Sequence, residues 1–123
     1  MNEVVDADYY YDGLADVLFV YIKDNEDYED AIDLNDNVIL SFNSQGVPVA
    51  FELLDASKML NANKFSLKHM QKININIMID KSQISVNGIF TFQVHSKLKD
   101  MKSSSTISND YDMPIVNIEL ATA

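Results

Sequence analysis

The sequence contains no cysteine, no tryptophan and no arginine, and only three glycines and two prolines in 123 residues. Without cysteine, the chain forms no disulfide and offers no thiolate to a metal or a substrate. The low glycine and proline contents, beside 47% hydrophobic residues, are typical of a globular protein rather than a disordered or fibrous one. We therefore expect a protein that folds around an ordinary apolar core.

Long apolar runs and a basic N-terminus are also missing. No stretch reaches the roughly 18 apolar residues of a membrane span. The first ten residues, MNEVVDADYY, carry acids where a secretory signal carries basic residues. We expect a cytoplasmic protein with no membrane partner. The length favours a single domain, residues 1–123, with 1–60 and 61–123 as its two halves.

Negative charge is concentrated at one end of the sequence. Residues 1–36 hold twelve of the 19 acidic residues and a single lysine, a net charge of −11, whereas residues 37–123 are nearly neutral. A nucleic-acid backbone is bound by basic residues, and all nine basic residues here are lysines, which lack the guanidinium fork that reads guanine. The distribution disfavours nucleic acid and suits a basic protein as partner.

Apolar patterning in the first half predicts antiparallel hairpins. The run ADVLFVYIK has apolar residues on both faces, which predicts a central strand covered on both sides. Asp12 and Gly13 predict the turn of a hairpin just before it, and NVILSF and VPVAFELL flank a second turn at NSQG. A further short strand is expected around residues 31–34 of the acidic region.

The second half continues the pattern, so the predicted fold class is α+β and β-rich, with an antiparallel sheet. ININIMID predicts a half-buried strand that pairs with GIFTFQVHSKLK, in which Leu98 is expected to point inward. MKSSSTISNDYDM predicts a polar loop or irregular edge strand, and PIVNIELATA a last short strand. One or two short helices are expected in the middle of the chain, with Asp55 and Ser66 as their N-caps.

A set of short motifs in the first half resembles domain-of-unknown-function family 2283. YDGLADVLFVYI and NVILSFNSQGVPVAFELLDASKML, within residues 9–60, carry a Tyr-Asp turn, an Ala-Asp-hydrophobic strand, a glycine-turn hairpin and a closing Leu-Asp-Ala-Ser. Gly13, Leu14 and Pro48 depart from the family's pattern. The resemblance implies a small β-rich domain with no established activity, so it brings no catalytic residues. The matching positions are Tyr11, Asp12, Ala15, Asp16, Leu18, Gly46, Glu52, Leu54, Asp55, Ala56 and Ser57.

Catalytic and metal-binding patterns are weak throughout the sequence. His69 and His95, the two histidines, have no metal-ligand spacing and are interpreted as solvated side chains. The acidic runs DNEDYED and DLNDN lack the glycine and glutamate positions of an EF-hand loop. The three glycines are isolated, which disfavours a phosphate-binding loop. We expect neither an enzyme nor a bound cofactor.

The functional prediction therefore depends on the acidic end. We expect a binding module that engages a basic partner through Asp24, Glu26, Asp27, Glu29 and Asp30. Two alternatives stay open: a structural or oligomerising domain whose acidity serves only solubility, and weak binding of Ca²⁺ or Mg²⁺ by clustered carboxylates. Apolar strands such as DVLFVYI and IFTFQV also predict a homo-oligomer, most simply a two-fold dimer.

Overall fold

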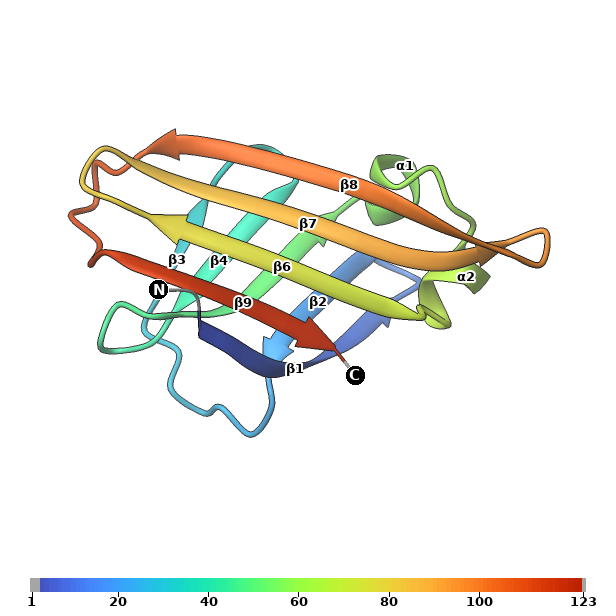
Figure 1. Ribbon diagram of the computed structural model, residues 1–123, viewed down its shortest axis with the longest axis horizontal. Coiled ribbons are helices and arrows are strands. Elements are labelled where there is room, and N and C mark those ends of the chain that lie inside the picture. Colours follow the sequence, from blue (N-terminus) through green and yellow to red (C-terminus); the bar gives the residue numbers. More distant parts are fainter. Residues whose placement is uncertain (1–2, 123) are drawn as a thin grey trace.

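The computed structural model describes residues 3–122, which form a nine-stranded sheet and two short helices (Figure 1). The strands are β1 (Glu3–Asp12), β2 (Val17–Ile22), β3 (Asp30–Asp33), β4 (Val38–Phe42), β5 (Pro48–Leu54), β6 (Lys72–Ile79), β7 (Gln83–Val94), β8 (Lys97–Ser108) and β9 (Val116–Thr122). The helices are α1 (Ala56–Met59) and α2 (Lys64–Lys68). The prediction of a β-rich chain with short helices in its middle is confirmed. Neither helix has the length or apolarity to cross a membrane.

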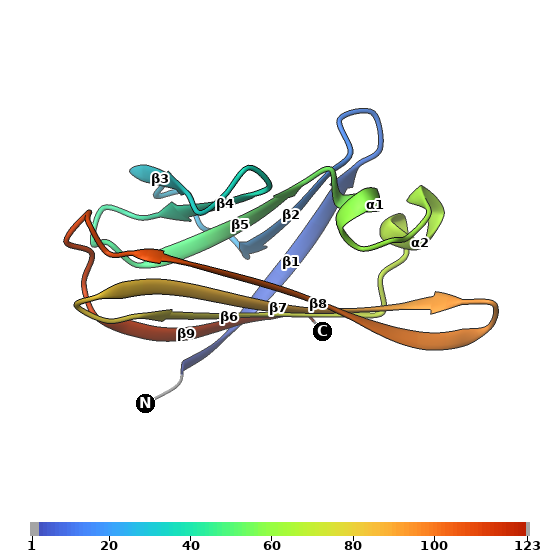
Figure 2. The same cartoon turned by 90° about the horizontal axis from the view of Figure 1, so that it is seen from above.

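The sheet curls into two facing layers. Its strand order is β3-β4-β5-β2-β1-β9-β6-β7-β8. Strands β3, β4, β5 and β2 form the first layer, and β9, β6, β7 and β8 form the second. The long β1 passes between the two layers (Figure 2). Both helices lie at one end of the molecule, between the layers (Figure 2).

One pair of strands departs from the predicted antiparallel arrangement. Strands β1 and β9 are parallel, from Glu3 opposite Ile118 to Ala7 opposite Thr122, whereas the other neighbours in the sheet are antiparallel. Hairpin turns impose an antiparallel direction on strands that follow one another. No such turn joins β1 to β9, because they come from opposite ends of the sequence. The prediction of a purely antiparallel sheet is corrected at this pair.

The core fills the space between the two layers and draws on both halves of the chain. Strand β6 shows the principle, because Ile73, Ile75 and Ile77 are fully buried while Asn74 and Asn76 on the opposite face are partly exposed. Burying each isoleucine side chain contributes about 1.5–3 kcal/mol relative to leaving it in water. The strand predicted from ININIMID is confirmed with the expected face inward.

Strand β2 lies inside the sheet, paired with β1 on one side and β5 on the other, but its outer face has no layer over it. Leu18 and Val20 are fully buried in the core, whereas Phe19 and Tyr21 on the outer face remain partly exposed. The prediction of cover on both sides is therefore wrong for the part of the chain that the structure describes. Both helices pack at the end of the layers, so they leave this apolar outer face open (Figure 2).

The predicted strand GIFTFQVHSKLK is in fact interrupted by a hairpin turn. Strand β7 ends at Val94, the chain reverses at His95 and Ser96, and β8 begins at Lys97. Both turn residues have positive φ, 51° and 67°, as a tight two-residue hairpin turn requires. The sequence hides this turn because neither residue is the glycine or asparagine usual there. As a result Leu98 is 59% exposed rather than inward, and the polar segment after it forms a regular edge strand.

Asp55 precedes α1 but does not cap it, so this prediction is wrong. Its backbone is left-handed, with φ 53° and ψ 43°, and its side chain makes no capping hydrogen bond. Asp16, in the turn after β1, takes that place instead. Its carboxylate accepts hydrogen bonds from the Ser57 backbone nitrogen at 3.0 Å and from Ser57 Oγ at 2.6 Å. A carboxylate distant in the sequence thus satisfies the first turn of α1.

The second helix also begins earlier than predicted. Asn63 is its N-cap, because Asn63 Oδ1 accepts a hydrogen bond from the Ser66 backbone nitrogen at 2.8 Å. Ser66 itself lies inside the helix and is buried, and its Oγ donates to the Gln93 carbonyl at 3.3 Å. The residue predicted as a cap therefore fastens α2 to the end of β7.

Substitutions at Asp55 separate a left-handed turn residue from a helix cap. We expect Asp55→Gly to leave the free energy of unfolding unchanged or to raise it by up to about 1 kcal/mol, because glycine adopts positive φ without steric cost. We expect Asp55→Ser to lower it by about 0.5–1 kcal/mol, since serine tolerates this conformation poorly. Urea unfolding measures both. A capping residue would give the opposite order, with serine equal to aspartate and glycine weaker.

Candidate functional site

The most specific family-like motif of the sequence forms a hydrogen-bonded lock between two turns. Tyr11 donates its hydroxyl to Asp16 Oδ1 at 2.6 Å, and Asp16 in turn receives the two bonds from Ser57. The Asp16 carbonyl also accepts from the Ala56 backbone nitrogen at 3.0 Å. These contacts fasten the β1–β2 turn to the start of α1, so the motif residues have a structural role.

Ionisation of this lock follows from its burial and hydrogen bonds. Burial alone would raise the pKa of Asp16, but the hydrogen bonds from Ser57 and Tyr11, together with nearby Lys64, outweigh it and hold that pKa below its ordinary value. The pKa of Tyr11 is raised, first by burial and then by its hydrogen bond to the Asp16 carboxylate. Asp16 is therefore the charged acceptor and Tyr11 the neutral donor.

An open groove lies beside the lock, on the outer face of the first layer that the helices leave uncovered. Its volume is about 600 Å³, within the range of ligand-binding clefts. We call it the aromatic groove, because four of its lining residues are aromatic. It is lined by Tyr10, Asp12, Phe19, Tyr21, Tyr28, Ser41, Ala50 and Glu52.

Strand register explains how residues from four strands meet in the aromatic groove. Tyr10 on β1 lies opposite Phe19 on β2, and Phe19 lies opposite Glu52 on β5. The rings of Tyr10 and Phe19 are stacked, with centroids 6.1 Å apart and an interplanar angle of 29°. In the adjacent row Tyr21 pairs with Ala50, whose small side chain deepens the floor.

The charge of the aromatic groove is entirely negative among its lining residues. Asp12 and Glu52 supply carboxylates, and no lysine lines the groove. The Asp12 carboxylate also accepts the Leu14 and Ala15 backbone nitrogens, at 3.0 and 3.2 Å. The pKa of Glu52 is raised, first because burial penalises its charge and second because Asp33 lies nearby. The groove therefore combines an apolar floor with uncompensated negative charge.

The predicted acidic segment borders this groove. Its five acids are exposed, in the loop between β2 and β3 and at the start of β3: Asp24, Glu26, Asp27, Glu29 and Asp30. Tyr28, in the middle of that segment, lines the groove. Asp27 has a structural role as well, because its Oδ2 accepts the Ser44 hydroxyl at 2.6 Å and so ties the loop to the β4–β5 turn.

Sequence reasoning found the acids but missed the aromatic residues beside them. The available signal was the run ADVLFVYIK, which is apolar on both faces and yet is covered on one face only. Within residues 3–122, no three histidine, aspartate or glutamate side chains are grouped as the ligands of a metal ion would be. His69 instead packs against Phe65, with ring centroids 4.5 Å apart, and His95 lies in the β7–β8 turn.

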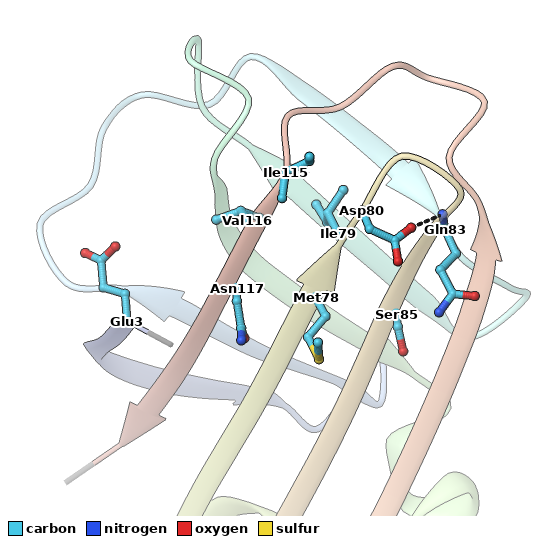
Figure 3. Close-up of a pocket in the computed structure, with 9 residues that line it drawn as sticks. All are labelled: Glu3, Met78, Ile79, Asp80, Gln83, Ser85, Ile115, Val116 and Asn117. Atoms are coloured by element: carbon cyan, nitrogen blue, oxygen red, sulfur yellow. Dashed lines mark hydrogen bonds between the residues drawn. The ribbon is translucent and has the colours of Figure 1, made fainter. Parts of the chain in front are cut away.

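A second hollow, of about 580 Å³, lies over the ends of β6, β7 and β9 (Figure 3). The two acids that line it, Glu3 and Asp80, lie on opposite sides and do not converge (Figure 3). Asp80 Oδ1 already accepts the Ser82 hydroxyl at 2.9 Å and the Ser82 and Gln83 backbone nitrogens, each at 2.8 Å. These bonds, that of the Ser82 hydroxyl first, lower the pKa of Asp80 and stabilise its turn. This hollow lacks a set of polar groups directed at one ligand.

The hollow beside α2 is larger, about 840 Å³, but its polar groups hold the helix in place. Lys64 Nζ donates to the Gly13 carbonyl at 2.7 Å. The Tyr9 hydroxyl donates to the Lys68 carbonyl at 3.1 Å and accepts from the Met70 backbone nitrogen at 2.8 Å. These bonds dock α2 on β1, so the aromatic groove remains the stronger candidate site.

Comparison with known proteins confirms the resemblance noted in the sequence. The family described as protein of unknown function (DUF2283) matches residues 9–57, which include the lock and every lining residue of the aromatic groove. A protein of Methanosarcina mazei named "Putative hypoxanthine phosphoribosyltransferase" is 29% identical over 107 residues, which are 87% of this chain and 85% of that protein. No solved structure matches the chain.

The Asp16 lock predicts a specific dependence of stability on pH. Because the pKa of Asp16 in the folded protein lies below the ordinary 3.8, its charge stabilises the fold above that pH, and the contribution is lost as the pH falls below it. We expect Asp16→Asn to lower the free energy of unfolding by about 1.5–3 kcal/mol near pH 7. In urea unfolding, the gap between variant and parent should narrow below pH 4. A gap of constant size down to pH 3 would contradict an ionised Asp16.

Proposed function

We propose that this protein is a non-enzymatic binding module that holds a basic segment of a partner protein in the aromatic groove and against the neighbouring acidic loop. The composition of the groove supports this proposal most directly. Aromatic rings form its floor, carboxylates form its only charged lining, and Tyr28 brings the segment with the five exposed acids to its edge. Such a surface is complementary to a chain with cationic side chains and apolar stems.

The uneven charge distribution supports the same proposal. Twelve acids and one lysine within residues 1–36 repel one another, which costs the folded protein stability. A basic partner removes that repulsion and is steered toward the surface before contact. If acidity served solubility alone, its position would not matter, and no exposed aromatic surface would be expected beside it.

The name of the Methanosarcina mazei relative raises a competing function, the transfer of a phosphoribosyl group to hypoxanthine. Proteins hold phosphate groups with basic side chains, glycine-rich loops or helix N-termini. The aromatic groove is lined by carboxylates, and the three glycines stand singly at positions 13, 46 and 88. The chemistry of this surface opposes a phosphorylated substrate, so binding rather than catalysis is the function we propose.

A homodimer is the second candidate, and the exposed edge of β8 favours it. Strand β8 has twelve residues and ends the sheet, so its outer backbone groups are not bonded to a tenth strand. Lysines 97, 99 and 102 protect its first half, as charges on edge strands commonly do, but Ser103–Ser108 carries none. Asn35 reaches this strand at one point, where its Nδ2 donates to Ser105 Oγ at 2.8 Å. Two copies could pair antiparallel along this segment.

Light scattering over a wide concentration range tests the dimer. We expect a mass that rises toward twice the 13.9 kDa of one chain as concentration increases. Ser104→Pro should keep the protein monomeric, because proline removes a backbone donor and cannot continue a ladder. A mass of one chain at every concentration would remove this candidate.

The basic-partner proposal predicts binding that depends on salt and on the position of the acids. An octalysine peptide with a fluorescent label should bind, and its dissociation constant should rise at least about tenfold as salt increases from ~0.01 to ~0.15 M, because the screening length falls from ~30 to ~8 Å. Changing Asp24, Glu26, Glu29 and Asp30 to their amides should weaken binding at low salt by a similar factor. Asp27 is kept, because it holds the loop.

A matched control removes the same number of charges elsewhere. It carries amides at Glu3, Asp6, Asp110 and Asp112, which are exposed positions at the start of β1 and between β8 and β9. This control should bind octalysine nearly as tightly as the parent. If the two variants weaken binding equally, net charge alone governs the interaction, and the acidity serves solubility rather than a site.

A further inference from the structure

The outer face of β2 is apolar, and neither helix covers it (Figure 2). Central strands that are apolar on both faces are normally covered on both faces. Here the inner residues Leu18 and Val20 are fully buried, while Phe19 and Tyr21 remain partly exposed in the aromatic groove. Tyr10, whose ring stacks on Phe19, is 58% exposed. The side chains of this floor are of the apolar kind that is usually buried, but no other part of the described chain packs over them.

The carboxylate of Glu52 indicates the charge of the group that completes this surface. Glu52 lies directly opposite Phe19 in the sheet, so its carboxylate borders the aromatic floor. Partial burial and the nearby Asp33 both disfavour its negative charge. Asp12 adds a second carboxylate to the lining, which contains no lysine. A cation at this position would remove an electrostatic cost that the free protein bears.

The shape of the floor distinguishes between the two common cationic side chains. The stacked rings of Tyr10 and Phe19 lie in an open groove on the sheet rather than in an enclosed box. A guanidinium group is planar and weakly hydrated, stacks on aromatic faces, and pairs with a carboxylate through two parallel hydrogen bonds. A lysine ammonium is compact and strongly hydrated, so its interaction with an open aromatic surface is weaker.

We infer that the aromatic groove is an arginine-binding site, in which the guanidinium group of a partner protein stacks on Tyr10 and Phe19 and pairs with the carboxylate of Glu52. This inference rests on the proposed function and names the side chain that the basic partner inserts. The acidic loop attracts the partner by charge, whereas the groove selects one side chain by shape. The two contributions depend on different residues and can be separated.

Three peptides that differ at one position test the selection. Each is a short, otherwise neutral peptide with a fluorescent label and a central arginine, lysine or citrulline, the last being a planar but uncharged analogue of arginine. Fluorescence anisotropy should show the tightest binding for the arginine peptide, then lysine, then citrulline. The dissociation constant of the lysine peptide should be about threefold to tenfold higher than that of the arginine peptide. Equal affinity for arginine and citrulline would overturn the inference, because charge would then play no part in the groove.

Variants identify the residues that are responsible. Tyr10→Leu and Glu52→Gln should each weaken binding of the arginine peptide by about threefold to tenfold and leave binding of the citrulline peptide nearly unchanged. Phe65→Leu is the matched control, because Phe65 is 72% exposed but lies outside the aromatic groove, and it should have no effect. Circular dichroism of each variant establishes that it is folded.

Failure of this inference can be told apart from failure of the proposed function. If the arginine and lysine peptides bind equally well and Tyr10→Leu changes neither, the inference is wrong while basic-partner binding stands. If neither peptide nor octalysine binds at low salt, both proposals are wrong. If hypoxanthine binds and is lost on Tyr10→Leu while the arginine peptide does not bind, the groove holds a purine and the arginine inference fails.

Discussion

Strand β1 is the element on which the rest of the structure depends, because it joins the two halves of the chain. It pairs with β2 along one edge and with β9 along the other, and it passes between the layers as it does so (Figure 2). The two sheet halves can therefore face each other and bury a common core. The same strand turns Tyr9 and Tyr11 toward the interior and Tyr10 toward the outer face.

Local features of the sequence determined how much of this fold could be predicted. The hairpins β1–β2 and β4–β5 and the alternating strand β6 were predicted, because turn residues and side-chain period act between neighbours in the chain. The parallel pairing of β1 with β9 could not be, since it joins residues more than a hundred positions apart. The turn at His95 and Ser96 was missed for a different reason, because neither residue is the glycine or asparagine that usually marks a two-residue hairpin turn.

The candidate site shows the same division between local and distant effects. The acids of the β2–β3 region are visible in the sequence because they are consecutive. The prediction that Asp55 caps α1 was wrong, because the Asp16 carboxylate, from a separate turn, accepts the backbone N–H of Ser57 in the first turn of that helix. The aromatic groove depends on the register of β1, β2 and β5, which brings Tyr10, Phe19 and Glu52 into one row. No pattern along the chain contains that row, although the two-faced apolar run of β2 indicates an uncovered surface.

We propose that a basic partner binds at the uncovered outer face of the first layer, and that acidity in general is not sufficient for binding. Mapping NMR chemical-shift changes while an arginine-containing peptide is added tests this most directly. We expect the largest chemical-shift changes at Tyr10, Phe19, Tyr21, Tyr28 and Glu52, with smaller changes in the acidic loop. Changes spread evenly over the exposed acids, or centred on the outer faces of β6 and β7, would contradict it.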